Sequence, residues 1–455
     1  MILQNRVRFI HTADLHLGSS LHYTGNSPTR IKRILDSAVI DSFKRICNIA
    51  LDYEVDFILI SGDLFDKKQQ SITANEIFYE QCQRLNEKGI NIYAISGNHD
   101  SNWETNRLFD LPENLYLMSS DRVEVKEIKD SQGSKLANIL GQSYRGKADS
   151  RKMYSFYNPP DQIGWNIGLL HSQLDPSNNN YVPCTYQDLC SKDDLHYWAL
   201  GHIHQSQILK ETNPAIVYPG IPQGRDFGEP GVGGCFLVDL IPKQRPEIKF
   251  IPTSSVVWKE ITISLREDKP DNPRNLEELR DKIENRAEKF LDKSPEINKN
   301  IDLTNQKKHD NFAGYIVRWV IQGRTSLHLS LQDQLDEAVT YLKKELREDV
   351  LGRKFFLWTE DIDIKTTPPL PSLEELKERN KIFAEIEEVV GICRDGENST
   401  LKEELKSQTG QIWNDNLDHE DYNEEKFQLD QDSLNKIIDQ ARERIIEKIL
   451  AERGE

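Results

Sequence analysis

The sequence of 455 residues lacks several features that would assign it to a special class of protein. No run of 18 apolar residues is present, and no apolar signal segment with a small-residue cleavage site stands at the N-terminus, so we expect no membrane span and a cytoplasmic location. Cysteine is scarce: the six residues are scattered without a C-x-x-C pair, which favours reduced thiols over disulfides or a zinc site.

An excess of positive charge is also missing, because the net charge is −17. Residues 1–250 contain 26 Lys and Arg against 30 Asp and Glu, whereas residues 251–455 contain 32 against 45. The bulk charge therefore argues against a nucleic-acid binder, and such a role would require local basic patches. The length is too great for a single core and predicts two or three domains.

What the sequence does contain is a set of polar residues placed directly after strand-like runs. The apolar run Phe57–Ile60 is typical of a strand buried on both faces, and Ser61-Gly62-Asp63 follows it with a tight turn and a carboxylate. One Gly-Asp pair after a strand is an ordinary turn. Four further runs have the same form, and they end in Asp14-Leu15-His16, Asn98-His99-Asp100, His171 and His202-Ile203-His204.

The order of the predicted elements indicates the fold class. Strands near residues 7–10, 57–60 and 90–95 alternate with helices near 27–51 and 71–88, which predicts a parallel sheet with crossover helices and ligands at its carboxyl edge. Short strands then follow with little helix between them, and we expect a second sheet and an α/β sandwich with outer helices. We assign to that second sheet the strands at 115–117, 123–125, 136–143, 166–171, 197–201, 215–218 and 235–240.

The organisation changes after residue 252. Helical periods beginning at Leu276 and Leu331 alternate with strands at 315–321 and 355–364, which predicts a small α+β module over 253–365. A proline-rich linker then opens a helical, acidic tail, 366–455. The last helix has an apolar stripe that either packs on the protein's own body or binds a partner. The stripe comprises Leu434, Ile437, Ile438, Ala441, Ile445 and Ile449.

The ordered motifs resemble the calcineurin-like metallophosphoesterase family, and more narrowly its SbcD-type DNA-repair nucleases of a bacterial exonuclease-like branch. The resemblance covers about residues 5–255, with Ser172 and Ile221 as departures that concern substrate-phosphate contacts. It implies a four-layer α/β sandwich over 1–252, a capping domain and a helical C-terminal tail. The motifs that carry it are His11–Gly18, Gly62–Asp66, Gly97–Asp100, Trp198–His204, Tyr218–Gly220 and Gln223–Arg225.

The resemblance also implies roles for individual residues. One divalent metal takes Asp14, His16, Asp63 and His204, and a second takes Asp63, Asn98, His171 and His202. This mixture of nitrogen and oxygen ligands fits Mn²⁺ or Fe²⁺ better than Mg²⁺, and of these we expect Mn²⁺. We predict that His99 protonates the leaving oxygen and that Asp100 orients its ring. Arg225 is predicted to clamp a phosphate oxygen, with a surface salt bridge as the alternative.

Three functions remain open at this point. The first is a metal-dependent DNA exonuclease or endonuclease that acts with an SbcC-type coiled-coil ATPase in DNA repair or defence. The second is an adaptor for such an ATPase in which catalysis is secondary, and the third is a phosphodiesterase for small molecules. The complete ligand set argues against a pure adaptor, because packing alone does not require seven such residues at strand ends. A homodimer is compatible with each function.

Overall fold

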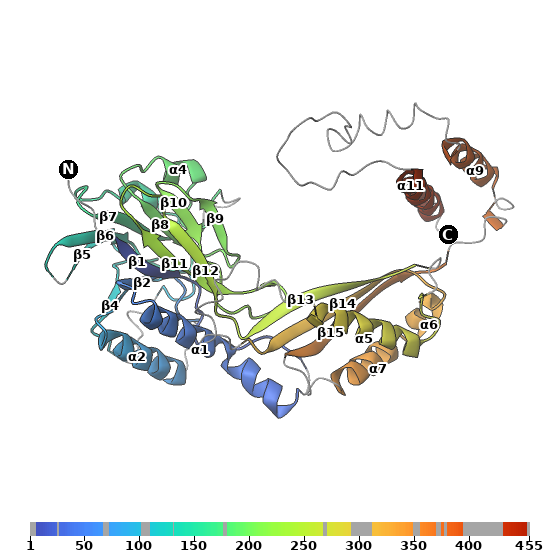
Figure 1. Cartoon of the computed structure of the whole chain (residues 1–455), viewed down its shortest axis with the longest axis horizontal. Helices are drawn as coiled ribbons and strands as arrows, with labels where there is room; N and C mark the ends of the chain where they lie inside the picture. The colour runs from blue at the N-terminus through green and yellow to red at the C-terminus, as the bar shows by residue number, and fades with distance from the viewer. Residues whose placement is uncertain are drawn as a thin grey trace. The chain divides into compact units, whose positions relative to one another are not determined.

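A computed structural model gives the structure of the chain (Figure 1). It describes residues 6–24, 27–66, 72–101, 110–130, 132–175, 180–266, 271–292, 312–348, 355–369, 375–376, 380–394 and 431–452. Contacts divide the chain into two units, Met1–Pro368 and Pro369–Glu455. The domain boundaries predicted at 252 and 365 stay predictions. Across the described ranges, no helix has both the length and the apolar character that a bilayer span requires.

The first sheet of the larger unit has six strands in the order β12-β11-β1-β2-β3-β4. Its parallel part consists of β1 (Val7–Thr12), β2 (Phe57–Ser61), β3 (Asn91–Ile95) and β4 (Leu115–Leu117). The antiparallel strands β11 (Gly234–Leu240) and β12 (Glu247–Pro252) extend it. Helices α1 (Thr29–Asp52) and α2 (Ile72–Asn86) connect the first three parallel strands and cover the outer face of the sheet (Figure 1).

The second sheet also has six strands, in the order β5-β6-β7-β8-β10-β9. Its parallel strands are β6 (Lys135–Gly141), β7 (Trp165–His171), β8 (Tyr197–Gly201) and β10 (Ala215–Tyr218). Antiparallel strands β5 (Glu124–Lys129) and β9 (Gln207–Lys210) form its two edges. The short helices η1 (Met153–Phe156) and α4 (Tyr186–Cys190) pack on its outer face through Met153 and Leu189.

The two sheets pack face to face, and their inner faces form one apolar layer. Phe9 of β1 stacks on Phe57 of β2 with ring centroids 5.2 Å apart, and it meets Tyr197 of β8 edge-on at 5.3 Å. Burial of such large side chains between the sheets is the main stabilising contribution to this layer. Outer helices and inner sheets together make the four layers that the sequence predicted, and that prediction is confirmed.

Two strands lie in a different sheet from the predicted one. β4 and β11 belong to the first sheet, because β4 pairs with β3 and β11 pairs antiparallel with β1. The β11 register aligns Phe9 with Val238. An apolar run predicts that a segment is a strand, but it carries no information about which strand becomes its neighbour.

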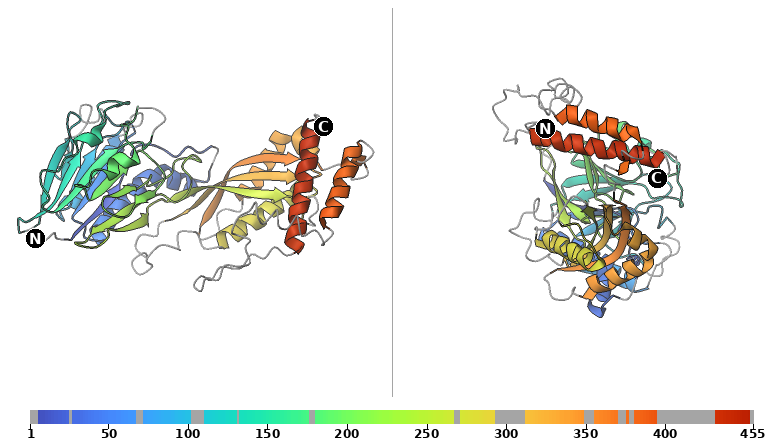
Figure 2. Two further views of the ribbon diagram at one scale, coloured as in Figure 1. Left: turned by 90° about the horizontal axis from the view of Figure 1, so that it is seen from above. Right: turned by 90° about the vertical axis from the view of Figure 1, so that its right-hand side faces the viewer.

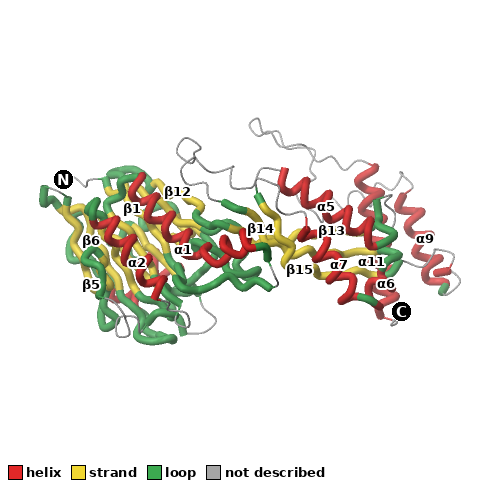
Figure 3. Tube along the Cα trace, turned by 90° about the horizontal axis from the view of Figure 1, so that it is seen from below, coloured by secondary structure: helices red, strands yellow, loops and turns green. Residues whose placement is uncertain are grey.

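A third sheet follows in the same unit, with the parallel order β13 (Val256–Leu265), β14 (Gly314–Arg324) and β15 (Phe356–Thr367). Parallel neighbours require crossover connections. Along the chain, helix α5 (Leu276–Asp292) follows β13 and precedes β14. Helices α6 (His328–Asp333) and α7 (Leu335–Glu348) follow β14 and precede β15 (Figure 3). One face of this sheet packs on α5 and α7, whereas Trp258 and Trp358 on the other face join the apolar cluster around α1.

The smaller unit contains α9 (Lys381–Arg394) and α11 (Gln431–Glu452), which lie side by side (Figure 2). Within the predicted tail, residues 370–374, 377–379, 395–430 and 453–455 lie outside the described residues. Of the stripe predicted for the last helix, the side chain of Leu434 lies outside the described residues, and Ile437 and Ile449 are half-buried. Ile438 is buried against α9, whereas Ala441 and Ile445 are exposed. Ile446 and Leu450 are buried in their place. Part of the stripe therefore packs on α9 and part of it is exposed, and its binding to a partner stays a prediction.

Candidate metal centre

The loops that follow β1 and β2 are joined through their main chains at the carboxyl edge of the first sheet. The N–H groups of Asp14 and His16 donate to the carbonyl oxygens of Gly62 and Asp63, each at 3.0 Å. Parallel strands end at the same edge, so two residues about fifty positions apart in sequence are brought within reach of each other. Their side chains project from one rigid main-chain frame.

Several predicted ligands have a main-chain conformation that is uncommon outside glycine. The φ angles are +51° at Asp14, +44° at His16, +52° at Asp63 and +95° at His202. Residues with such angles cost free energy and gather at functional sites, where the surrounding structure holds them in place. The strain at these residues supports a functional rather than a structural origin of the cluster.

Two glycines allow the strands to approach each other at this edge. Gly62 has a φ of +96°, and a Cβ atom there would lie 2.3 Å from Nδ1 of His171. A Cβ atom on Gly201 would lie 1.9 Å from the carbonyl oxygen of Ser61. Each glycine directly precedes a predicted ligand in the sequence. Because neither glycine has a Cβ atom, β2 can approach the second sheet this closely.

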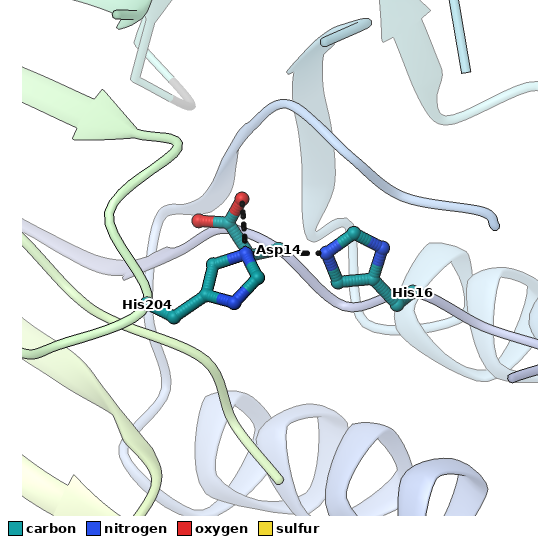
Figure 4. A group of neighbouring side chains, drawn as sticks. All are labelled: Asp14, His16 and His204. Carbon is teal, nitrogen blue, oxygen red and sulfur yellow. Dashed lines mark hydrogen bonds and ion pairs between the residues drawn. The ribbon is translucent and has the colours of Figure 1, made fainter. Parts of the chain in front are cut away.

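The first group of ligand atoms comprises Asp14, His16 and His204, which point toward a common centre (Figure 4). Asp14 and His16 come from the loop after β1, and His204 comes from the loop after β8. Nε2 of His204 lies 3.8 Å from Oδ1 of Asp14 and 3.4 Å from Nε2 of His16. Nε2 of His16 also lies 4.0 Å from Oδ2 of Asp63, so this group borders the loop after β2.

The second group lies on the other side of Asp63. Nε2 of His171 is 3.4 Å from Oδ2 of Asp63 and 3.1 Å from Oδ1 of Asn98. Nδ1 of His202 is also 3.1 Å from Oδ1 of Asn98. Asp14, Asp63 and His171 form a further set of converging ligand atoms. One oxygen of Asp63 thus faces both groups, as expected for a carboxylate shared by two metals.

Burial and the mutual charges set the protonation of these groups. Burial raises the pKa of Asp14 to about 6. Burial also opposes ionisation of Asp63, but the neighbouring His171 and His16 outweigh it and hold the pKa of Asp63 well below its ordinary value. Burial disfavours the charged form of His171, yet the Asp63 carboxylate raises the pKa of His171 to about 9. The pKa of His202 falls to about 3 through burial and the proximity of His171.

These atoms fit a pair of divalent cations. A cation with bonds of about 2.1 Å holds adjacent ligand atoms roughly 3 to 3.5 Å apart, and the shortest separations between the ligand atoms here are 3.1 and 3.4 Å. The donors are imidazole nitrogens and amide or carboxylate oxygens, a mixture that suits Mn²⁺ or Fe²⁺. The structure brings all seven predicted ligands to this edge, and their assignment to individual metals stays a prediction.

His99 lies beside the cluster and is only half-buried. Its main-chain N–H donates to Oδ1 of Asp63 at 2.9 Å, and its ring meets the His16 ring edge-on at 4.8 Å. The side chain of Asp66 approaches both histidine rings and forms a third set of ligand-type atoms with them. Asp66 ends one of the motifs in the sequence, but no role was predicted for it.

Asp100 is placed differently from the prediction that it orients the His99 ring. Its Oδ1 accepts from the N–H of Gly97 at 2.7 Å, and its Oδ2 accepts from the N–H of Leu64 at 2.7 Å. Both carboxylate oxygens are therefore occupied by main-chain donors, and no hydrogen bond between Asp100 and the His99 ring is found within the described ranges. Burial and the nearby Asp63 raise the pKa of Asp100 to about 7. The geometry makes Asp100 a brace between the loops after β2 and β3.

Arg225 is paired with an acidic residue that the sequence did not single out. Its guanidinium binds Glu229, with Nε 3.1 Å from Oε2, and its Nη1 lies 3.9 Å from Oδ2 of Asp66. The salt bridge foreseen as the alternative for Arg225 is therefore present, although it is largely buried rather than at the surface. The phosphate clamp stays a prediction. Glu229 also contacts His204, and no local sequence pattern marks it.

A comparison with protein-family models matches residues 7–206 to the calcineurin-like phosphoesterase family. The curated relatives include the uncharacterized metallophosphoesterase YhaO of Bacillus subtilis, which is 35% identical over 263 residues, 57% of this chain and 64% of the relative. The DNA double-strand break repair protein Mre11 of Methanocaldococcus jannaschii is 29% identical over 247 residues, 51% of this chain and 62% of the relative. A component of the nuclease SbcCD of Bacillus subtilis is 25% identical over 292 residues, 57% of this chain and 70% of the relative.

In the first two of these relatives, the chain spans less than two thirds of the relative's own length. The family match nevertheless includes β1 to β8 and all seven predicted ligands, and it ends two residues beyond His204. The fold, the order of the ligands along the chain and the matched family model therefore agree that residues 7–206 are similar to the calcineurin-like phosphoesterases.

Proposed function

We propose that this chain hydrolyses DNA phosphodiester bonds, using two divalent cations of which Mn²⁺ is the best fit. The observation that carries the proposal is the convergence of carboxylate, amide and imidazole ligand atoms on both sides of Asp63. Only two of the seven predicted ligands, Asp14 and Asp63, are carboxylates. Two divalent cations would therefore leave the site with net positive charge, which favours an anionic phosphodiester.

The cations and the side chains of the site have different roles in this reaction. When bound, the cations would polarise the phosphodiester and lower the pKa of an attacking water to about 7. Asp63 and Asn98 hold the ligand frame together at the carboxyl edge of the first sheet. The half-buried His99 lies beside the ligands, where its ring can supply a proton to the leaving oxygen. The hydrogen bond from the main-chain N–H of His99 to Asp63 fixes the position of His99 relative to the predicted ligands.

The names of the relatives support DNA as the substrate, because one is a DNA double-strand break repair protein and another is part of a nuclease. By the same resemblance we propose an SbcC-type coiled-coil ATPase as partner, with the helices of the smaller unit as its docking segment. The six cysteines are free thiols, four of them buried, as expected for a protein that acts on cytoplasmic DNA.

A substrate panel tests this proposal. The protein is incubated with end-labelled duplex, hairpin and single-stranded DNA, and with bis-p-nitrophenyl phosphate and cyclic nucleotides, in Mn²⁺ or in EDTA. We expect Mn²⁺-dependent cleavage of DNA that disappears in Asp63→Ala, which controls for a contaminating nuclease. Hydrolysis confined to the small phosphodiesters would instead support a small-molecule enzyme. Absence of any hydrolysis, together with capture of an ATPase, would support the adaptor.

A further inference from the structure

His204 is held by a carboxylate on the side of its ring that faces away from the other ligands. Nδ1 of His204 lies 2.7 Å from Oε1 of Glu229, whereas its Nε2 faces Asp14 and His16. A carboxylate can only accept a hydrogen bond, so Nδ1 carries a proton and donates it to Glu229. The lone pair of Nε2 is then available to a metal ion in the neutral ring.

Glu229 itself is fixed by Arg225. The main-chain N–H of Arg225 donates to Oε2 of Glu229 at 2.7 Å, and Nη2 of the guanidinium donates to Oε1 at 2.5 Å. The two side chains are only 10% and 12% exposed. Burial by itself would raise the pKa of Glu229, but the hydrogen bonds from His204 and Arg225 outweigh it and keep that pKa far below its ordinary value.

The loop that carries both residues is anchored on the third sheet. Nε1 of Trp258 in β13 donates to the carbonyl oxygen of Gly224 at 2.9 Å, and the N–H of Gly231 donates to the carbonyl oxygen of Trp258 at 3.2 Å. Trp258 is fully buried. Glu229 therefore lies between two anchored points of the loop, and Arg225 holds its carboxylate against His204.

We propose that Glu229 is a positioning residue for His204, which holds the imidazole with Nε2 directed at the metal, and that Arg225 acts by fixing Glu229. This inference rests on the proposed two-metal function. Histidine ligands in metalloproteins commonly donate their second ring N–H to such a carboxylate, and loss of the carboxylate lowers metal affinity about 10- to 100-fold. Arg225 thereby acquires a function that does not require contact with a substrate phosphate.

Calorimetric titration of the metal-free full chain with Mn²⁺ tests the inference without DNA. We expect Glu229→Ala to weaken one of the two binding events about 10- to 100-fold and to leave the other close to wild type. Glu229→Gln keeps an acceptor oxygen but no charge, so we expect an intermediate loss. Glu260→Ala is the matched control, because Glu260 pairs with Arg318 in the same unit without contacting a predicted ligand. It should bind Mn²⁺ as the wild type does.

A small carboxylate should restore the Mn²⁺ affinity of the Glu229→Ala variant. A cavity of about 170 Å³ is lined by Glu229 and His204 among others, and truncation of Glu229 would enlarge it enough to admit formate. We expect formate, but not chloride at the same ionic strength, to recover most of the lost Mn²⁺ affinity. This rescue separates a positioning role from general loss of structure.

The outcomes are distinct. Wild-type affinity at both sites in folded Glu229→Ala and Glu229→Gln would overturn the role of Glu229 and leave the proposed function intact. If Glu229→Ala does not fold, as judged by circular dichroism, the isosteric Glu229→Gln decides. A wild-type protein that binds no Mn²⁺ would overturn the proposed function and this inference together.

Discussion

The main-chain N–H of His99 donates a 2.9 Å hydrogen bond to Oδ1 of Asp63, while Oδ2 of the same carboxylate faces His171 at 3.4 Å and His16 at 4.0 Å. One side chain therefore connects both groups of ligand atoms with the residue proposed to supply a proton. The bond uses the main chain of His99, so it does not depend on the imidazole ring. A substitution of the His99 side chain can therefore remove the chemistry of its ring and leave the ligand geometry unchanged.

Replacing His99 by alanine should remove the proton donor without removing a ligand. The main-chain bond to Asp63 survives in His99→Ala, so we expect metal and DNA binding to be retained. Cleavage should fall about 10²- to 10⁴-fold, the usual contribution of a general acid. The rate is measured on labelled DNA in Mn²⁺, with metal content determined on the same sample. Unchanged cleavage, or a parallel loss of metal, would show that the assigned role is wrong.

Replacing Asp100 by alanine should destabilise the loops rather than abolish a chemical step. Asp100→Ala leaves the buried N–H groups of Gly97 and Leu64 without their acceptor, which costs about 1 to 3 kcal/mol for each unsatisfied group. Chemical denaturation of the metal-free protein measures the loss. Asp130→Ala is the control, because Asp130 accepts from the N–H groups of Gln132 and Ser134 in an exposed turn. Equal destabilisation by the two substitutions would contradict the bracing role of Asp100.

His11 should make stability depend on pH. Its ring is fully buried, with Nε2 bonded to the carbonyl oxygen of Leu200 and Nδ1 to the hydroxyl of Tyr197, so it is a packed histidine and not a ligand. Burial lowers its pKa from 6.5 to about 3. The unfolded chain therefore takes up a proton first, and stability present above pH 6.5 is lost as the pH falls toward 3.

The slope contributed by His11 approaches about 1.4 kcal/mol per pH unit within this window. We expect His11→Gln to be less stable at pH 7 but to lose stability more slowly between pH 6.5 and 5. Denaturation curves at several pH values measure the slopes. The control His22→Gln alters a histidine whose side chain is 64% exposed, and it should keep the wild-type slope. Identical slopes for all three proteins would contradict the assignment.

The sequence could indicate which polar residues lie together because they share one local rule. Each predicted ligand follows a strand-like run directly, and the carboxyl ends of parallel strands meet at one edge. That rule places Asp14, Asp63 and Asn98 together without any knowledge of side-chain contacts. Continuous apolar runs are typical of strands that are buried on both faces, and they favoured two stacked sheets. In the structure, β2 and β7 are buried along their whole length.

Other features depend on contacts that no local pattern records. Glu229 is one of 75 acidic residues, and it meets His204 across 25 positions of sequence only because the loop is anchored on Trp258. The pairing of β11 with β1 joins segments more than 220 residues apart. Asp100 was assigned to His99 as its neighbour in sequence, whereas its carboxylate turns toward the main chain of Leu64. In each case the partner is chosen by tertiary packing.

The smaller unit should be separable from the larger one. Stopping the chain after Pro371 removes α9 and α11, which pack on each other through Phe383 and Ile446 among others. We expect the truncated protein to fold, to bind Mn²⁺ and to cleave DNA, but to lose capture of the proposed coiled-coil ATPase in co-purification. Retained capture would place the docking segment elsewhere. Failure to fold would show that the helices are part of the core.

The most direct test of the two-metal centre is the number of transition metal ions bound per chain. The purified protein is loaded with Mn²⁺, passed over a desalting column and analysed for metal and protein. We expect two ions per chain for the wild type and a loss at both sites in Asp63→Ala, because Oδ2 of Asp63 faces both groups of ligand atoms. One ion or none in the wild type, or an Asp63→Ala variant that still holds two, would contradict the two-metal centre.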